Sequence, residues 1–381
     1  MVKALIKKLA NKAFNSFFYR IFSSIVLYRD LLIICALPKY PVYNRFFFGK
    51  QITVLISEPT HFCSELPPQL EEKLGIYTPI RKYCNTFENV SILGGTSPIV
   101  LSLERKPLWN TIAYQFFNWE KYYTPIKWFL QSRLKFQWFD EEYAVFIYST
   151  WSSNYFHWLL DNLARLQFLD FMDDSIKAKT KILIGGKLSP FQTSSLLALG
   201  FENIEYIEKN NFIVKRLFVP NFSLEQQGYD LDQIIWLRNK IFQNLKNVKF
   251  ESDITRVLIL RRPVNGRSFL NQEEVLNALI PLGFKAFYLE ELSFEEQVNL
   301  FKRANCIVAA HGAGLANIIF SEKATVIEIF GKTIFPCYFQ LAKTLGLSYS
   351  FLLCKSGQSA GGAKNEDLKV DVSLLLRLTF H

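Results

Sequence analysis

The sequence predicts an α/β protein with two Rossmann-like domains that face each other across a cleft. From residue 143 onward, short apolar runs alternate with segments of helical periodicity, which is typical of a parallel sheet wound with helices. A polar, charged interval at 247–255 divides this alternation, so we expect the link between the domains there. The chain has 381 residues, half of them hydrophobic, and is long enough for two such cores.

The first domain is expected to span residues 41–246. Apolar runs indicate its strands, and local signals indicate where its helices begin and end, such as Ser189-Pro190 before one helix and Gly200 after it. The predicted strands are 51–56, 90–92, 144–148, 181–184, 204–207 and 214–219, and the predicted helices are 154–171, 190–199 and 232–245.

The second domain is expected to span residues 247–355, with the same alternation of strands and helices. Residues 356–381 are expected to form a Gly- and Ser-containing loop and a final helix that packs back on the first domain. The predicted strands are 257–260, 285–288, 307–310, 325–330 and 349–354, and the predicted helices are 272–280, 294–303, 315–320 and 368–378.

Residues 1–40 form a basic segment ahead of these domains. Seven Lys and Arg side chains stand against Asp30 alone, which supplies +6 of the chain's net charge of +10. Charged residues interrupt its apolar run before the roughly 18 residues that a spanning helix needs. Two interpretations stay open: an amphipathic helix on an anionic membrane surface, and a helix packed on the protein's own body.

A run of small residues, His311-Gly312-Ala313-Gly314, separates a predicted strand from a predicted helix. Small residues let a backbone turn tightly and let a ligand approach the main chain. The free N–H groups of the following helix, which contains Asn317, favour a phosphate at this loop. The full GxGxxG pattern is absent, so a tight turn without a ligand is the alternative.

Three charged residues accompany this loop. Glu328 lies in an apolar strand, where an unpaired carboxylate is unfavourable, and ribose hydroxyls are one candidate partner. Arg261 and Arg267 flank a short loop directly after another strand. A guanidinium group stays charged and binds two oxygens at once, which suits a diphosphate. The alternative for these two residues is a pair of surface arginines.

Polar residues on the predicted helix 154–171 share one face. Asn154, His157 and Asp161 follow an i, i+3, i+7 spacing, and Asn154 also suits the helix N-cap. An Asp four residues after a His can tune the imidazole toward general-base strength. The alternative is a hydrogen-bonded core His beside a solvated Asp. Asn154 and Trp158 are expected on the side of this helix that meets an acceptor.

Other residue patterns exclude some classes of function. Six scattered Cys residues indicate reduced thiols in a reducing compartment, and four His without a His/Cys cluster argue against zinc. Asp230-Leu231-Asp232 precedes a predicted helix, so we expect Asp232 to cap that helix rather than to bind a metal. The charge pattern shows no basic stripe on a recognisable nucleic-acid-binding module, so no nucleic-acid partner is expected.

Several of these motifs together resemble family 61 glycosyltransferases. The family includes capsular-polysaccharide-type bacterial enzymes, plant xylosyl- and arabinosyltransferases, and animal protein O-GlcNAc-transferring relatives. The chain departs from the family at Asn271-Gln272, where the family has Asn-Glu. The resemblance covers roughly residues 140–335 and is carried by NYFHWLLDNLARL, LILRRPVNGRSFLNQEEV, LSFEEQVNLFKRAN, HGAGLANIIF and TVIEIF.

The resemblance implies an inverting, metal-independent glycosyltransferase of GT-B architecture. His157 or Asp161 would serve as the base, and Arg261, Arg267 and the His311–Asn317 loop would bind a nucleotide sugar, expected to be UDP-linked. The expected acceptor is a glycan or a lipid-linked saccharide in surface polysaccharide (capsule) biosynthesis. The expected location is cytoplasmic, peripheral on the inner face of the membrane if residues 1–40 bind it. A non-catalytic nucleotide- or carbohydrate-binding scaffold of the same fold is the alternative.

Overall fold

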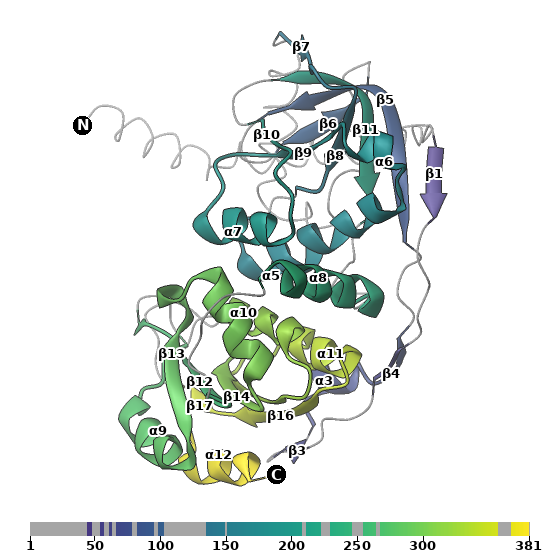
Figure 1. Ribbon diagram of the computed structural model, residues 1–381. Helices are drawn as coiled ribbons and strands as arrows, with labels where there is room; N and C mark the ends of the chain where they lie inside the picture. The colour runs from purple at the N-terminus through teal and green to yellow at the C-terminus, as the bar shows by residue number, and fades with distance from the viewer. Residues whose placement is uncertain are drawn as a thin grey trace, which may run out of the picture.

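Two large β-sheets with helices between them dominate the described part of the molecule (Figure 1), and two small sheets of two strands each accompany them, β2 (Val54–Ile56) with β4 (Gly75–Tyr77) and β17 (Lys355–Ser356) with β18 (Leu368–Lys369). The computed structural model describes residues 44–47, 54–56, 61–62, 66–77, 82–94, 98–102, 135–148, 151–207, 211–221, 229–245, 254–263, 267–356 and 367–380. The basic segment 1–40, most of the expected link at 247–255 and most of the predicted loop after residue 356 lie outside the described residues.

The first sheet is mixed rather than wholly parallel. β11, β8, β9 and β10 run parallel, whereas β5 is antiparallel to its neighbours β1, β6 and β11. The parallel part is the part whose strands alternate with helices in the sequence, as parallel neighbours require crossover connections. In spatial order the strands are β1 (Asn44–Phe47), β5 (Tyr83–Leu93), β11 (Phe212–Pro220), β8 (Tyr143–Phe146), β9 (Thr180–Ile184) and β10 (Ile204–Tyr206), with β6 (Ile99–Leu101) on β5 and β7 (Gln137–Trp138) on β11.

Helices of this half lie toward the second sheet. The helix predicted over 154–171 is a succession of three types: an α-helical turn, a π-helical turn and a 3-10 segment. Helices α7 and α8 match the predicted ranges 190–199 and 232–245 closely, and Ser189 begins α7 in a capping box, whereas the short helix α6 was not predicted. The helices are α5 (Tyr155–His157), η4 (Trp158–Asn162), η5 (Leu163–Phe171), α6 (Asp174–Lys177), α7 (Pro190–Ala198) and α8 (Leu231–Asn244).

Within the described residues, every strand pair in the second sheet is parallel, as the sequence predicted for this half. The strands, in spatial order, are β13 (Phe284–Tyr288), β12 (Arg256–Leu260), β14 (Cys306–Ala310), β15 (Thr325–Phe330), β16 (Ser348–Leu353) and β3 (His61–Phe62). The helices are α9 (Gln272–Leu279), η8 (Ile280–Leu282), η9 (Leu289–Glu291), α10 (Phe294–Arg303), η10 (Ala313–Phe320), α11 (Cys337–Thr344) and α12 (Val372–Thr379).

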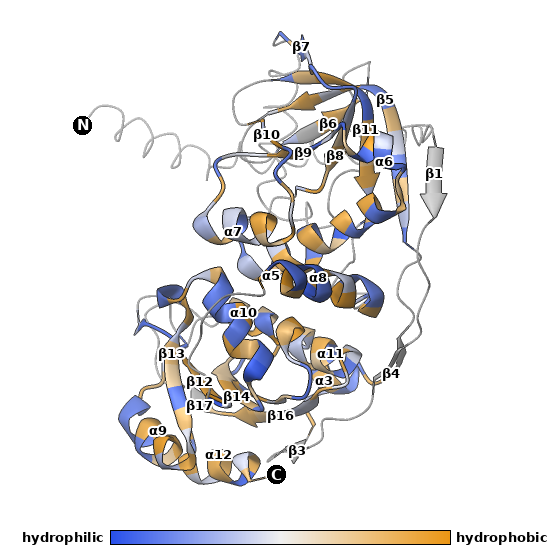
Figure 2. Ribbon diagram, in the orientation of Figure 1, coloured by the Kyte–Doolittle hydropathy of each residue, from blue (hydrophilic) through white to orange (hydrophobic). Residues whose placement is uncertain are grey.

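Side-chain alternation along the strands divides the core into layers. On β12, Val257 and Ile259 join an inner core between the two sheets, while Leu258 and Leu260 join an outer core. The first sheet divides in the same way, since Val145 belongs to the inner core and Phe146 to the opposite face. β8, β14 and β16 are mostly hydrophobic in Figure 2, as expected for strands covered on both faces.

Two expectations about the domain limits need correction. The final helix α12 packs against α9 and β16 instead of the first domain, because Leu375 and Leu378 complete the outer core of the second sheet. Residues in the expected first domain also reach the second sheet. β3 pairs with β16, and the β2–β4 hairpin (Val54–Ile56 and Gly75–Tyr77), which flanks α3 (Pro68–Glu71), contacts α11 through β2.

Candidate functional site

The small-residue loop follows β14 and meets an arginine. Gly312 is the N-cap of the 3-10 helix η10, and Ala313 begins that helix. A Cβ atom on Gly312 would lie 2.2 Å from Nη1 of Arg261, and one on Gly314 would lie 2.6 Å from Cδ1 of Leu289. A larger residue at either position would therefore displace the end of a neighbouring side chain, and at Gly312 the group that approaches the backbone is a guanidinium.

Arg261 and Arg267 meet at this loop, as the sequence predicted. Their Nη1 atoms donate hydrogen bonds to the backbone carbonyl of His311 at 3.2 and 3.0 Å. Burial lowers the pKa of both guanidinium groups, and the charge of Arg267 lowers that of Arg261 further. Two positive groups thus share one neutral oxygen, an arrangement that an incoming anion stabilises.

Glu328 has protein partners and is not available to a ribose. Its Oε1 lies 2.5 Å from Nδ1 of His311, and its Oε2 accepts a hydrogen bond of 2.6 Å from the Tyr349 hydroxyl. Glu328 is fully buried, because its side chain lies on the inner face of β15. The predicted ribose contact is replaced by a role in holding His311, and burial together with Glu328 raises the pKa of Tyr349.

Aromatic rings complete the setting of His311. Its ring stacks against Phe330 and Phe335, with centroids 5.6 and 5.2 Å away. With Nδ1 directed to Glu328, the other ring nitrogen is the one left to meet a ligand. The structure therefore keeps His311 as a candidate ligand-binding residue beside both arginines.

Asn317 has a structural role in place of the predicted ligand contact. Its Oδ1 accepts a hydrogen bond of 2.6 Å from the Tyr155 hydroxyl, and its Nδ2 donates to Gln297 and to the Gly314 carbonyl at 3.0 and 3.1 Å. The side chain is fully buried. Tyr155 comes from α5, so this amide connects the two halves of the molecule.

The predicted pair on α5 is present. Nδ1 of His157 lies 2.6 Å from Oδ2 of Asp161, and the two side chains are 14% and 12% exposed, enough for the imidazole to be reached from outside. Asn154 caps the helix by accepting hydrogen bonds from the N–H groups of Phe156 and His157, so its predicted capping role is confirmed. Only its Oδ1 is engaged in that cap and the residue is exposed, so its predicted position on the acceptor side stays a prediction.

Asp161 lies in the π-helical turn η4, a local distortion that often marks functional positions. Burial raises its pKa, while the hydrogen bond to His157 and the charge of Arg165 act in the opposite direction. Its second oxygen, Oδ1, is buried and has no hydrogen-bond partner among the described residues. The hydrogen bond to His157 therefore offsets part of the cost of burying the Asp161 carboxyl group.

Arg165 is a positioning residue that the sequence interpretation missed. It is fully buried and donates to the carbonyls of Pro220 (2.5 and 2.9 Å), Ile147 (2.7 Å) and Phe146 (3.2 Å). Burial lowers its pKa to about 9. The signal was present in the sequence, since Arg165 follows Asp161 by four residues, but the strand-end carbonyls that it binds were not predictable.

Trp158 is misplaced in the predicted acceptor set. Its side chain is fully buried, and its Nε1 donates to the Ser195 hydroxyl at 2.8 Å. A different tryptophan lies beside the imidazole: Trp151 is 42% exposed, and its ring centroid lies 5.7 Å from that of His157. Sequence reasoning missed it because Trp151 precedes the helix and has no place in the helical spacing.

The two candidate centres are connected through rings. Phe156 contacts His157 with centroids 5.1 Å apart, and it contacts Tyr338 of α11 at 5.5 Å. Tyr338 in turn lies 5.3 Å from His311. The structure therefore places the His157–Asp161 pair and the His311 loop two aromatic rings apart, although the two motifs stand some 150 residues apart in the sequence.

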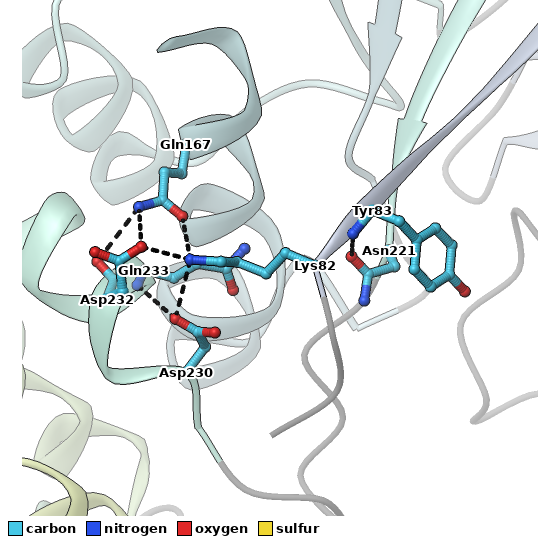
Figure 3. Close-up of polar contacts among 7 residues, drawn as sticks. All are labelled: Lys82, Tyr83, Gln167, Asn221, Asp230, Asp232 and Gln233. Carbon is cyan, nitrogen blue, oxygen red and sulfur yellow. Dashed lines mark hydrogen bonds and ion pairs between the residues drawn. The ribbon is translucent and has the colours of Figure 1, made fainter. Parts of the chain in front are cut away.

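The Asp230-Leu231-Asp232 triplet binds a lysine (Figure 3). Nζ of Lys82 donates to Asp230 at 3.4 Å, to Asp232 at 2.5 Å and to Gln167 at 3.1 Å. Asp230, not Asp232, is the N-cap of α8, since its side chain accepts from the Gln233 N–H. The capping prediction is thus wrong by two residues, and an ammonium group occupies the position between the two carboxylates.

Metal-binding clusters and membrane-spanning helices are both absent from the described part of the chain. Within it, no group of three or more His, Cys, Asp or Glu side chains is arranged to hold a metal ion. Nor does any helix there combine the length and the apolar character needed to cross a bilayer.

Known proteins are similar to the part of the chain that holds most of these site residues. Residues 155–327 match the family model described as Glycosyltransferase 61, which confirms the resemblance predicted from the motifs. The EGF domain-specific O-linked N-acetylglucosamine transferases of Gallus gallus and Mus musculus are each 33% identical to the chain over 100 residues. Each match covers 25% of this chain and 19% of the relative, so the chain matches about a fifth of the length of these curated relatives.

Two solved structures of the glycosyltransferase TibC also align with the chain. An iron-containing heptosyltransferase TibC in complex with ADP-D-beta-D-heptose aligns with 11% identity and a TM-score of 0.29, over 54% of this chain and 61% of that one. TibC from enterotoxigenic E. coli aligns with 10% identity and a TM-score of 0.32, over 76% and 73%. At these TM-scores the likeness supports no statement about this chain.

Proposed function

We propose, from the premise that residues 155–327 form a glycosyltransferase 61 domain, that this protein transfers a sugar from a nucleotide-sugar donor to a saccharide acceptor. One observation carries the proposal. Two arginines and His311 gather at one loop, and a His–Asp pair from the other half of the molecule lies two aromatic rings away. A diphosphate-binding group beside a base is the minimum that such a transfer needs.

The donor's diphosphate would bind at Arg261, Arg267 and His311. Arg261 and Arg267 supply fixed positive charge, and the contact of Glu328 with Nδ1 holds the His311 ring in one orientation. Charge that develops on the departing diphosphate is met by groups already in place, which is the most effective form of electrostatic catalysis. A UDP-linked donor is our choice of nucleotide, by analogy with the family resemblance.

His157 would remove the proton from the attacking hydroxyl of the acceptor. If its Nδ1–H donates to Asp161, its Nε2 is free to accept that proton, and Asp161 stabilises the imidazolium that results. The acceptor oxygen then bonds to the anomeric carbon as the bond to the diphosphate breaks, so the configuration inverts. Asp161 itself is the alternative base.

The positive charge at the donor site makes the reaction independent of metal in this proposal. Arginines Arg261 and Arg267 take the place that a divalent cation has in other transferases. The acidic triplet Asp230-Leu231-Asp232 already binds Lys82. Addition of EDTA should therefore leave the rate almost unchanged.

Three further features belong to the same proposal. We infer a GT-B architecture, with the two sheets as its two halves and the site between them. The acceptor would be a glycan or a lipid-linked saccharide of a surface polysaccharide such as a capsule, and the protein would act in the cytoplasm. Residues 1–40, with their charge of +6, would hold it at an anionic membrane. Co-sedimentation with anionic vesicles should fall with salt and disappear in a protein that starts near residue 41.

The test is a donor panel. Purified protein is mixed with UDP-, GDP-, ADP-, CMP- and dTDP-linked sugars, and both nucleotide release and thermal shift are measured with and without a panel of pyranosides. Turnover of one donor, with an inverted anomeric configuration in the product by NMR, supports the proposal. If a donor binds and no nucleotide is released under any condition, the non-catalytic scaffold is the better description.

A further inference from the structure

We propose that the exposed face of Trp151 is the platform on which a pyranose ring of the acceptor stacks, so that its hydroxyl group meets His157. This inference rests on the proposed function and names the substrate class for its acceptor side: a saccharide ring with an apolar C–H face. Trp151 belongs to no predicted motif; the proposal rests on its exposure to solvent and on its position beside His157.

The main chain from which the indole projects is held by a hydrogen-bonded turn. The carbonyl of Trp151 accepts a hydrogen bond of 2.8 Å from the Asn154 N–H, and Asn154 then caps α5. Both Trp151 and His157 are thus held by the same turn at the start of this helix. Because the ring centroids lie 5.7 Å apart with 41° between the planes, the indole flanks the imidazole.

The Trp151 indole is unusually exposed for a large aromatic side chain. Trp151, which precedes α5, is 42% exposed, whereas Trp158 in η4 is fully buried and its Nε1 donates to the Ser195 hydroxyl. A large aromatic side chain loses the favourable burial of its surface when it faces water. A flat ligand that covers the ring recovers that surface, and the aromatic quadrupole attracts the partly positive C–H groups of a sugar.

The neighbouring groups select the acceptor over the nucleotide. Positive charge is gathered at Arg261 and Arg267 in the second half of the molecule, where a diphosphate and its nucleoside would bind. Trp151 lies in the first half, next to the base. A ring stacked there can present a hydroxyl to His157, which a nucleobase cannot supply to the reaction.

A saccharide-binding experiment tests this assignment separately from catalysis. Binding of a panel of methyl pyranosides and disaccharides is measured by saturation-transfer NMR on wild type, Trp151→Ala, Trp151→Phe and Trp138→Ala. Trp138 is the matched control, because it is 55% exposed on β7, at the far end of the first sheet (Figure 1). Thermal melting confirms that each variant is folded.

We expect Trp151→Ala to weaken pyranoside binding by at least about tenfold, the scale of losing one aromatic stacking partner. Trp151→Phe should retain part of the affinity, and Trp138→Ala should bind as wild type. In wild type, saturation should be strongest on the C–H protons of one sugar face. Equal binding by wild type and Trp151→Ala, or no binding of any pyranoside to wild type, overturns the assignment. Failure of donor turnover, in contrast, counts against the proposed function and leaves this binding result to be judged alone.

Discussion

The molecule holds two histidine–carboxylate pairs that differ in construction. His157 and Asp161 lie four residues apart in one helical segment. His311 directly follows β14, and Glu328 lies seventeen residues later on the neighbouring strand β15; this second pair is called the strand pair below. Asp161 leaves one oxygen without a partner among the described residues. Both oxygens of Glu328 are engaged, one by His311 and one by Tyr349.

The two pairs differ in how firmly the carboxylate is held, and this bears on which pair can transfer a proton. The carboxylate of Glu328 is fixed from two sides and fully buried, which suits a group that holds His311 still. Asp161 is only partly held, its pKa is raised by burial, and its His157 neighbour is partly exposed. We therefore propose that the His157–Asp161 pair transfers the proton, and that Glu328 holds His311 beside the proposed anion site at Arg261 and Arg267.

The largest expected effect comes from breaking the helical pair. His157→Ala should lower kcat by roughly 10²–10⁴-fold, the usual range for a general base, while donor affinity stays near wild type. Steady-state kinetics and calorimetric donor binding measure the two quantities. Asp161→Asn should lower kcat less than His157→Ala does; a larger loss in Asp161→Asn would make Asp161 the base, and a near-normal kcat in His157→Ala would contradict the mechanism.

The second-largest effect is expected at the proposed anion site beside His311, where Arg267 lies. Arg267→Ala should weaken nucleoside-diphosphate binding by roughly 1.5–3 kcal/mol, because a charge-assisted hydrogen bond is lost. Arg262→Ala is the matched control: Arg262 lies on the same loop region, but its guanidinium pairs with Glu290 and Glu291 at the surface. Isothermal calorimetry with UDP compares the two variants, and equal affinities would remove Arg267 from the donor site.

A smaller effect is expected from the carboxylate beneath His311. Glu328→Gln should lower the free energy of unfolding by about 1–3 kcal/mol, since a buried charged hydrogen bond is replaced by a weaker one. It should also weaken UDP binding, because His311 loses its orientation. Urea unfolding and calorimetry measure these changes, with Tyr349→Phe as the milder variant that removes one of the two bonds. An unfolding curve and a UDP affinity both identical to wild type would show that the strand pair is not a holding device.

The smallest effect concerns pH. Burial raises the pKa of Asp161 above its unfolded value of about 3.9, so the folded state favours the protonated acid. This contribution to stability is fully present below the unfolded pKa and is lost as the pH rises through the folded pKa. Relative to wild type, Asp161→Asn should therefore gain stability between acid and neutral pH. Urea unfolding at several pH values measures the difference, and a difference that is constant with pH contradicts the prediction.

Much of the second half of the molecule was predictable from the sequence. Helix α10 spans Phe294–Arg303 as predicted, since Ser293 and Glu296 form a capping box and the apolar residues follow one helical face. Strand β15 spans Thr325–Phe330 as predicted, because a run of buried residues without helical periodicity leaves little choice. Helix α11 was missed, since the aromatic segment from which it forms lacks a start signal other than Pro336.

The site was predictable only where its partners are close in sequence. The spacing of His157 and Asp161 revealed their contact. Glu328 was recognised as needing a partner, but His311 and Tyr349 meet it through strand register, which no local pattern records. Asn317 and Trp158 were assigned to ligands for the same reason, because their partners Tyr155 and Ser195 come from distant segments.

The short strand β3 limits how the protein can be dissected. It pairs with β16 at the edge of the second sheet, although it lies more than 180 residues before that sheet's other strands in the chain. A fragment beginning near residue 247 would lack β3. It would expose the N–H and C=O groups of β16 that pair with β3, and exposed strand edges promote aggregation. The second sheet therefore takes one edge strand from the N-terminal part of the chain, and an excised second half should carry β3 as well, for instance by circular permutation.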